Sequence, residues 1–540
     1  ATVAELERLV ALGQLPRPVL DRAVRAVLSE MFSYGLIAHP LHPRPKADTV
    51  TPERLAFALK AAEESMVLLK NRGGILPLGD RYDSVALIGT DASSQPTSTG
   101  YGSAYVRSRD VISPLAGLKM ALPGSVHITY AAGGVPAADV TSLAGANRRI
   151  SRISRSSRIS RSSRGATSLT AASGRRAGLL SPPGSRVSRS VLTARRARRG
   201  PGWKTWRTTL EVRRSGTYEL SLRQSGDIWC SLDHKVVLSV SGMQGRSYSA
   251  TSLHLVARRH YLLQLRWFST PRSQPPKIAL EDVSARIAVA VRTARAADVA
   301  VVFVGDPSEE GVDRPNLALP ADANALIRAV ARANPRTVVV LNTGGAVLMP
   351  WIHEVKAVLE AWYPGQETGP ATAAVLTGAV DPSGRLPLTF PASEGQSPVA
   401  PSQRYPGKDA TVSYSEGLDI GYRWYLAKQI RPLFPFGYGL SYTSFSLSGA
   451  QVLQDREGDS VGVWVRNTGR RRGTEVVEVY ISYPPSAGEP PEQLRGFSRV
   501  TLGPGSATEV WVTIPRSGFS SWINGAWRVP RGRYSVAIGT

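Results

Sequence analysis

The sequence has a single cysteine, Cys230, so no disulfide can form within the chain. Its seven histidines are scattered, and none has a metal-ligand spacing such as HExxH. No apolar run approaches the roughly 20 residues that a membrane-spanning helix needs. These absences argue against a disulfide-stapled scaffold, a metalloenzyme of the HExxH type and a membrane protein. We therefore expect no cofactor, no metal and no membrane partner. The sequence does not indicate the cellular compartment.

Acidic residues and lysine are absent from residues 146–200, a stretch that holds fifteen arginines. It includes two tandem copies of ISRSSR, at residues 153–158 and 159–164. The net charge of +25 would suggest a polyanionic partner, but without these fifteen charges it falls to 25 − 15 = +10 over the other residues. The basicity of the chain is thus largely local.

Three interpretations of this Arg/Ser-rich segment compete. It shows no period of 2 or 3.6, so disorder is expected. A nucleic-acid-binding tail is the least favoured interpretation, because no folded nucleic-acid module accompanies it. A solvated low-complexity insertion is the second. The favoured hypothesis is a shifted reading frame in a GC-rich gene, which translation of the other two frames tests.

Short apolar strands alternate with helices over much of the chain. Helices are predicted at 16–37, at Pro52–Asn71 with Thr51 as N-cap, and at Ala321–Asn334. Continuous Val/Ile runs bounded by glycine or polar turns predict strands at Val85–Gly89, Val299–Gly305, Thr337–Asn342 and Ala357–Trp362. Such runs between helices are typical of a mostly parallel sheet covered on both faces.

Two other regions have the alternation of antiparallel sheets. Tyr218, Leu220 and Leu222 alternate with polar residues, which predicts a β-sandwich inserted into a loop of the α/β domain. After about Ser446 the pattern is all-β, with turns every 8–12 residues or so, as in an immunoglobulin-like sandwich. The fold class is therefore multidomain α/β plus β.

Eight segments in order resemble glycoside hydrolase family 3 of the β-glucosidase type. They are AAEESMVLLKNRGGILPL, VALIGTDA, GYGSAYV, EEGVDRPNLALP, NTGGAVLMPW, AWYPGQETGPA, DPSGRLPLTFP and FPFGYGLSYTSF. The end of the chain resembles that family's fibronectin type III-like domain, and the insert resembles its protective-antigen-type sandwich. The resemblance implies these divisions: a post-barrel helix and linker at 1–45, an α/β sandwich at 46–135 and 281–395, an inserted sandwich at 136–280, connecting loops at 396–445 and the fibronectin type III-like domain at 446–540.

In that family a (β/α)₈ barrel precedes the α/β domain and carries the nucleophilic aspartate in a Ser-Asp-Trp context. This sequence contains no such tripeptide. The resemblance therefore implies a chain without the nucleophile, inactive alone on aryl β-glucosides, with a separately encoded barrel domain as its partner.

The family's acid/base glutamate lies in an E-G-x-D-R context, which here implies Glu310, with Glu309 as the alternative if the register is off by one. Gly311 would give the backbone freedom to aim the side chain. Asp313 and Arg314 are expected to hold the loop by a carboxylate–guanidinium pair. The expected substrate is a β-glucoside or oligosaccharide, hydrolysed with retention.

Other candidates are given structural roles. GYG at 100–102 is predicted to be a turn and Cys230 a buried small side chain. The stretches 414–425 and 434–442 are predicted to pack at domain junctions. Alternative functions are a non-catalytic carbohydrate-binding scaffold, nucleic-acid binding through 148–199, and, more distantly, a dinucleotide-binding oxidoreductase.

Overall fold

The structure is a computed structural model. It describes residues 3–39, 50–79, 81–93, 96–100, 102–106, 108, 110–133, 202–212, 214–224, 228–240, 247–269, 276–306, 308, 310–311, 314, 316–320, 322–455 and 458–539. The Arg/Ser-rich segment, and every interpretation of it, lies outside the described residues. The chain divides into two units, residues 1–55 and 56–540.

The first unit holds two helices, α1 (Val3–Ala11) and α2 (Arg17–Ser33). Helix α2 confirms the helix predicted at 16–37, and Arg17 directly follows Pro16, which lies at its N-cap. None of its residues is buried.

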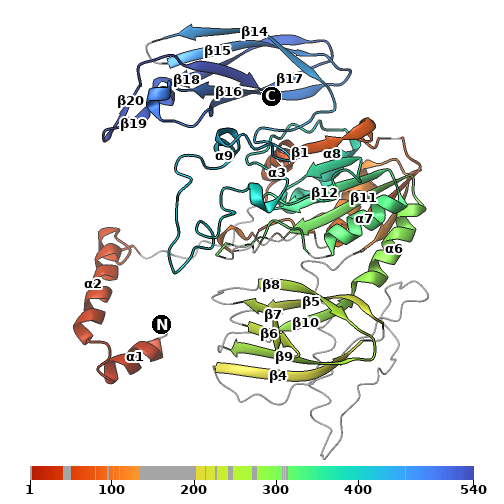
Figure 1. Ribbon diagram of the computed structural model, residues 1–540, viewed down its shortest axis with the longest axis vertical. Helices are drawn as coiled ribbons and strands as arrows, with labels where there is room; N and C mark the ends of the chain where they lie inside the picture. The colour runs from red at the N-terminus through yellow and green to blue at the C-terminus, as the bar shows by residue number, and fades with distance from the viewer. Residues whose placement is uncertain are drawn as a thin grey trace, which may run out of the picture. The chain divides into compact units, whose positions relative to one another are not determined.

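A six-stranded sheet in the order β1-β13-β12-β11-β2-β3 forms the centre of the second unit (Figure 1). Its strands pair in parallel except for β1, which runs antiparallel to β13. The strands are β1 (Val67–Asn71), β2 (Ser84–Ile88), β3 (His127–Ala131), β11 (Val299–Asp306), β12 (Thr337–Thr343) and β13 (Ala357–Glu360). The mostly parallel sheet predicted from the Val/Ile runs is confirmed.

Helices cover both faces of this sheet, and each face has its own apolar core. Residues of α6 and α7 pack in one core, and residues of α3, α4 and α8 pack in the other. Every residue of β12 is buried, as its unbroken apolar run predicted. The helices are α3 (Pro52–Ser65), α4 (Pro114–Ala121), α6 (Val283–Arg295), α7 (Ala323–Ala333) and α8 (Thr368–Thr377).

The helix predicted at Pro52–Asn71 is wrong in its last turn and a half. Thr51 does accept a hydrogen bond from the backbone N–H of Arg54 at 3.4 Å, so the predicted N-cap is confirmed. Helix α3 ends at Ser65, however, and the chain continues as β1. Residues 66–69 are consecutive and all buried, and backbone pairing with β13 makes Val67–Asn71 a strand.

Between β3 and α6 the chain forms two antiparallel sheets, β4-β9-β6-β7 and β10-β5-β8, which enclose one apolar core. Strand β10 ends at Asp282, whose carboxylate accepts a hydrogen bond from Ala285 N and so caps α6. The strands are β4 (Gly202–Glu211), β5 (Gly216–Gln224), β6 (Ile228–Leu232), β7 (Lys235–Val240), β8 (Ser247–Leu255), β9 (His260–Ser269) and β10 (Lys277–Asp282).

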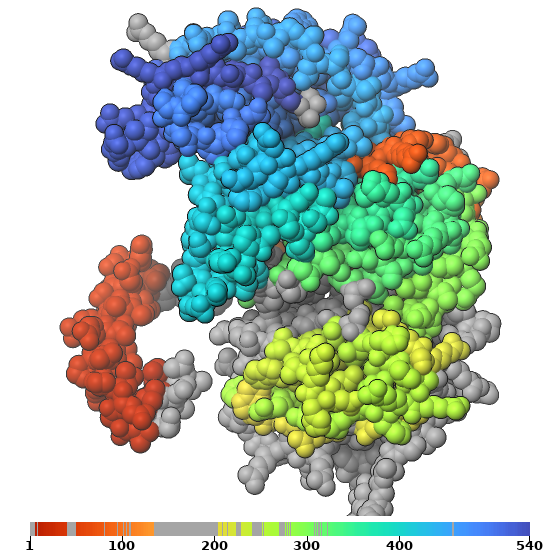
Figure 2. Space-filling view, in the orientation of Figure 1, coloured from red at the N-terminus to blue at the C-terminus, as the bar shows by residue number. Residues whose placement is uncertain are grey.

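The C-terminal region consists of two three-stranded sheets, β14-β15-β18 and β17-β16-β21, around a further apolar core, with a small β19–β20 hairpin. A connecting segment, which includes α9 (Tyr422–Ala427), precedes it and is cyan in Figure 2. The strands are β14 (Phe445–Gln454), β15 (Gly458–Asn467), β16 (Gly473–Ser482), β17 (Gln493–Leu502), β18 (Ala507–Pro515), β19 (Ser521–Ile523), β20 (Ala526–Arg528) and β21 (Ser535–Gly539).

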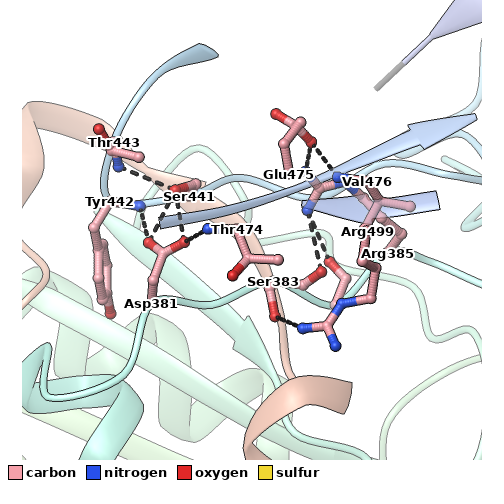
Figure 3. Close-up of polar contacts among 11 residues, drawn as sticks. Asp381, Ser383, Arg385, Ser441, Tyr442, Thr443, Thr474, Glu475, Val476 and Arg499 are labelled. Carbon is pink, nitrogen blue, oxygen red and sulfur yellow. Dashed lines mark hydrogen bonds and ion pairs between the residues drawn. The ribbon is translucent and has the colours of Figure 1, made fainter. Parts of the chain in front are cut away.

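Polar side chains join the α/β region to these C-terminal strands (Figure 3). The carboxylate of Asp381 accepts hydrogen bonds from Tyr442 N at 2.7 Å and from Thr474 N, in β16, at 3.2 Å. Arg385 forms an ion pair with Glu475 of β16, and both side chains are more than nine-tenths buried. We call Asp381, Arg385 and Glu475 the polar junction.

Among the described residues, no helix combines the length and the apolar character needed to cross a bilayer.

Candidate active site

Acidic and polar side chains gather where the parallel strands end. Asp306 and Thr343 are the last residues of β11 and β12, Glu360 is the last of β13, and Asp91 lies shortly after β2. All four are buried. Since the carboxyl ends of parallel strands share one edge, this is the edge at which open α/β sheets place their ligands.

Burial raises the pKa of two of these carboxyl groups, Glu360 and Asp91. Burial above all, together with the negative charge of Asp306, raises the pKa of Glu360 to about 8. Hydrogen bonds from Trp362 N at 2.9 Å and Thr343 Oγ1 at 3.0 Å act in the opposite direction. Burial raises the pKa of Asp91 to about 6. A Cβ on Gly305 would lie 2.1 Å from Asp91 Oδ2, so only glycine fits at this point of β11.

Glu310, the predicted acid/base residue, lies in the loop that follows β11 and is exposed. Its Oε2 accepts hydrogen bonds from both the backbone N–H of Ser103, at 2.7 Å, and the Ser103 hydroxyl. These bonds favour the ionised form and hold the pKa of Glu310 below its usual value. Gly311 has a φ of +77°, which confirms the backbone freedom predicted for it.

Glu310 lies against Gly102, the last residue of the GYG stretch, and Ser103, the residue after it. Gly102, the last residue of the stretch predicted to be a turn, begins a short 3-10 turn that extends to Ala104. Its φ is +83°, and a Cβ there would lie 2.5 Å from the Cβ of Glu310. The two loops can therefore approach this closely because Gly102 has no side chain.

The ends of the Glu310 loop are held by Tyr363 and Arg314. The Tyr363 hydroxyl accepts a hydrogen bond from Ser308 N at 2.9 Å and donates one to the carbonyl oxygen of Asp306. The Arg314 guanidinium lies 2.9 Å from Asp306 Oδ2 and donates a hydrogen bond to Ala346 O at 3.0 Å.

Two sequence-based expectations concerned the neighbours of Glu310. Arg314 does help to hold the loop, but its carboxylate partner in the structure is Asp306. Asp313, the expected partner, and Glu309, the alternative acid, lie outside the described residues.

Glu310 is the exposed carboxylate of this site, and an exposed carboxylate can deliver or accept a proton. No other acidic side chain of the described residues raises its pKa. Nor do His, Cys, Asp and Glu form a group of three or more that could hold a metal ion in the described parts of the chain. Among the residues that the structure describes at this edge, Glu310 is the exposed carboxylate, and Asp91, Asp306 and Glu360 are buried.

Of the remaining candidates, Cys230, Tyr422 and the 434–442 stretch have the structural roles predicted for them, whereas Tyr414, Leu418 and Ile420 of the 414–425 stretch are exposed. Cys230 is fully buried, and burial raises the pKa of its thiol to about 12. In the 414–425 stretch, Tyr422 stacks on Phe436 with ring centroids 4.5 Å apart and accepts a hydrogen bond from Leu494 N, in β17, at 2.8 Å. In the 434–442 stretch, a Cβ on Gly437 would lie 2.3 Å from Glu478 Oε2, in β16.

Sequence analysis did not identify Ser103 or Tyr363. Both stand inside segments that carry the resemblance, GYGSAYV and AWYPGQETGPA. Their positions directly after glycine and after a predicted strand were the available signals, but nothing in the sequence related either residue to Glu310.

Known proteins support the resemblance over most of the chain. The family model described as glycosyl hydrolase family 3 C-terminal domain matches residues 66–442, and a fibronectin type III-like domain matches residues 475–540. A β-glucosidase from Rhizobium radiobacter is 33% identical over 532 residues, which cover 90% of this chain and 61% of that protein.

Solved structures agree. A β-glucosidase from Streptomyces venezuelae in complex with D-glucose superposes with a TM-score of 0.73 at 34% identity, over 99% of this chain and 64% of that one. A β-glucosidase from Kluyveromyces marxianus in complex with glucose gives a TM-score of 0.66 at 28% identity, over 100% of this chain and 67% of that one. The chain thus spans about two thirds of the length of these relatives or slightly less. Because the family model matches most of the chain and its relatives are β-glucosidases with the same fold, the chain belongs to glycosyl hydrolase family 3.

Proposed function

We propose that the chain contributes the acid/base part of a retaining β-glucosidase-type hydrolase, with Glu310 as the proton-transfer residue. The single observation that supports this most is the exposed Glu310 carboxylate on a loop at the carboxyl end of β11, held there by Ser103. The relatives are β-glucosidases, two of them solved with glucose. A terminal β-linked glucosyl residue is therefore the proposed substrate.

Retaining hydrolysis needs two carboxyl groups about 5–5.5 Å apart. One attacks the anomeric carbon and forms a glycosyl–enzyme bond while the other protonates the departing oxygen. The second group then takes a proton from water, which releases the sugar. We assign the second role to Glu310 and assign the first to a barrel domain outside these 540 residues.

The charge state of Glu310 agrees with a missing partner. An acid catalyst must retain its proton near the working pH, which burial or a neighbouring negative charge achieves. Glu310 is exposed, and its Ser103 contacts lower its pKa. A nucleophilic carboxylate and a bound sugar beside Glu310 would act in the opposite direction.

The proposed organisation follows the family. Residues 46–135 and 281–395 form the α/β domain, 136–280 a protective-antigen-type sandwich, and 446–540 the fibronectin type III-like domain. Residues 1–45 connect to the barrel, and 396–445 are connecting loops.

The test compares the 540-residue chain with a fusion that places the barrel region of the Rhizobium radiobacter relative before it. We expect no turnover of aryl β-glucosides by the chain alone. In the fusion, Glu310→Gln should lower kcat about 10²–10⁴-fold for substrates with poor leaving groups. It should have little effect on the glycosylation of a dinitrophenyl glucoside, whose leaving group needs no protonation.

Azide is the second readout, since a small anion can replace the base-assisted water in the deglycosylation of Glu310→Gln and give a β-glucosyl azide. The intact relative serves as the positive control. Turnover by the 540-residue chain alone, lost in Glu310→Gln, would contradict the assignment of the nucleophile to another segment. Glycan binding without turnover in either form would instead favour a non-catalytic scaffold.

A further inference from the structure

The Tyr363 hydroxyl joins two backbone groups at the start of the Glu310 loop. It accepts the N–H of Ser308 and donates its proton to the carbonyl of Asp306. Tyr363 itself follows β13, which is separated from β11 by β12 in the sheet. The side chain therefore reaches past the end of one strand to fix the exit of another.

Two glycines leave the space that the Tyr363 ring fills. A Cβ on Gly344, just after β12, would lie 3.0 Å from both Cε2 and the hydroxyl oxygen of Tyr363. A Cβ on Gly100 would lie 3.5 Å from the same ring carbon. Burial raises the pKa of the phenol, so the hydroxyl stays protonated and able to donate.

The backbone before Tyr363 is held in an uncommon conformation. Trp362 has a φ of +55°, which a bulky residue rarely adopts unless its surroundings enforce it. Its N–H donates to Glu360 Oε1 at 2.9 Å, and its carbonyl accepts a hydrogen bond from Asn342 Nδ2 at 3.2 Å. Two buried side chains thus fix the direction in which the next residue leaves the sheet.

We infer that Tyr363 is a positioning residue for Glu310, which sets where the Glu310 loop leaves β11 through its two hydrogen bonds to Asp306 and Ser308. The inference deepens the proposed function and rests on it for its catalytic consequence. Arg314 fixes the other end of the same loop through Asp306 and Ala346. Contacts of Tyr363 and Arg314 thus hold the chain on both sides of Glu310.

The first experiment uses the 540-residue chain and does not depend on activity. Amide hydrogen exchange of peptides spanning residues 306–314 is compared between the wild type, Tyr363→Phe and Tyr442→Phe. The matched control loses a buried hydroxyl that donates to Val375 O at 2.8 Å, in the same domain. We expect exchange in 306–314 to rise about tenfold in Tyr363→Phe only, as the loss of a buried hydrogen bond allows.

The second experiment measures kinetics in the barrel fusion. Tyr363→Phe should lower kcat about 10- to 100-fold for glucosides with poor leaving groups while KM and the glycosylation rate of the dinitrophenyl glucoside change little. A purely structural defect would lower kcat by the same factor for all substrates. Tyr442→Phe should leave this leaving-group dependence unchanged.

The outcomes separate the two claims. Equal exchange in 306–314 for Tyr363→Phe and Tyr442→Phe overturns the inference, whatever Glu310 does. Faster exchange with an unaltered leaving-group dependence also overturns it, provided that Glu310→Gln alters that dependence. If Glu310→Gln has no such effect, the proposed function fails, and the exchange result alone decides whether Tyr363 holds the loop.

Discussion

At the scale of single residues, Ser103 controls the charge of Glu310. One carboxylate oxygen accepts both the backbone N–H and the hydroxyl of Ser103. Hydrogen bonds to the charged form stabilise it, so Glu310 is held as a carboxylate in this chain. Acid catalysis needs the protonated form, and the Ser103 hydroxyl therefore opposes that role until other groups surround Glu310.

Removing the Ser103 hydroxyl should move the pH profile. Ser103→Ala keeps the backbone donor and loses the hydroxyl, so the pKa of Glu310 should rise. Because the acid must be protonated, the rate falls as pH rises through this pKa. The alkaline limb of kcat/KM in the barrel fusion should accordingly shift to higher pH.

Ser93→Ala is the control, because the Ser93 hydroxyl donates to Thr90 O in the same region and has no hydrogen bond to Glu310. An alkaline limb that stays in place, or that moves to lower pH, in Ser103→Ala would disprove the role given to this hydroxyl.

The sequence predicted part of this site. Glu310 and Gly311 could be identified because they are neighbours within one short motif. Ser103 and Tyr363 could not, since they lie 207 and 55 positions from the residues that they bind. Contacts of this kind arise from the order of strands in the sheet, which local sequence does not specify.

At the scale of elements, the hydrophobic pattern predicted the fully buried strands correctly and one buried segment wrongly. Strands β2, β11, β12 and β13 were predictable because uninterrupted Val/Ile runs are typical of strands buried on both faces. Residues 66–71 were assigned to a helix because their apolar positions also fit a helical stripe. Pairing with β13, a long-range contact, makes Val67–Asn71 a strand, and no local signal distinguished the strand from a helix.

The carboxyl end of β13 should make stability depend on pH in an unusual direction. The pKa of Glu360 is about 8 in the fold against 4.5 as its ordinary value, so between these values the folded state binds a proton that the unfolded state lacks. Stability therefore rises as pH falls from about 8 to about 4.5. The slope reaches about 1.4 kcal/mol per pH unit.

Glu360→Gln removes this titration. The free energy of unfolding of the wild type minus that of the variant, from urea unfolding, should increase as pH falls through that window. Asp91→Asn is the companion variant, for which the corresponding difference should change with pH only between about 6 and 3.8, the folded and ordinary pKa values of Asp91. A pH-independent difference for Glu360→Gln would show that Glu360 does not hold its proton in the fold.

At the scale of the whole molecule, the polar junction couples the α/β domain to the C-terminal β domain. Asp381 and Arg385 come from one, and Glu475 comes from β16 of the other (Figure 3). The ion pair is almost completely buried, so burying either charge without the other would be energetically costly. The two domains are therefore expected to unfold together.

Breaking the ion pair on one side should uncouple them. Arg385→Met leaves Glu475 buried without its partner, at a cost of about 3–5 kcal/mol. Calorimetry should then resolve two thermal transitions in place of one. The double variant Arg385→Met/Glu475→Leu should recover most of the loss, because apolar side chains can fill the same space.

Arg17→Met is the control for loss of an ion pair as such. Its partner Asp21 is mostly exposed, and such pairs contribute about 0–1 kcal/mol. A melting profile of Arg385→Met identical to that of the wild type would refute the coupling.

The six-stranded sheet is built from two separate stretches of chain, residues 67–131 and 299–360, on either side of the Arg/Ser-rich segment. None of its hydrogen-bonded strand pairs uses a residue between them. A change confined to residues 146–200, a repaired shift of frame included, therefore leaves the sequence of every strand of this sheet unaltered. The loop that carries Glu310 can thus be inherited intact beside an altered segment.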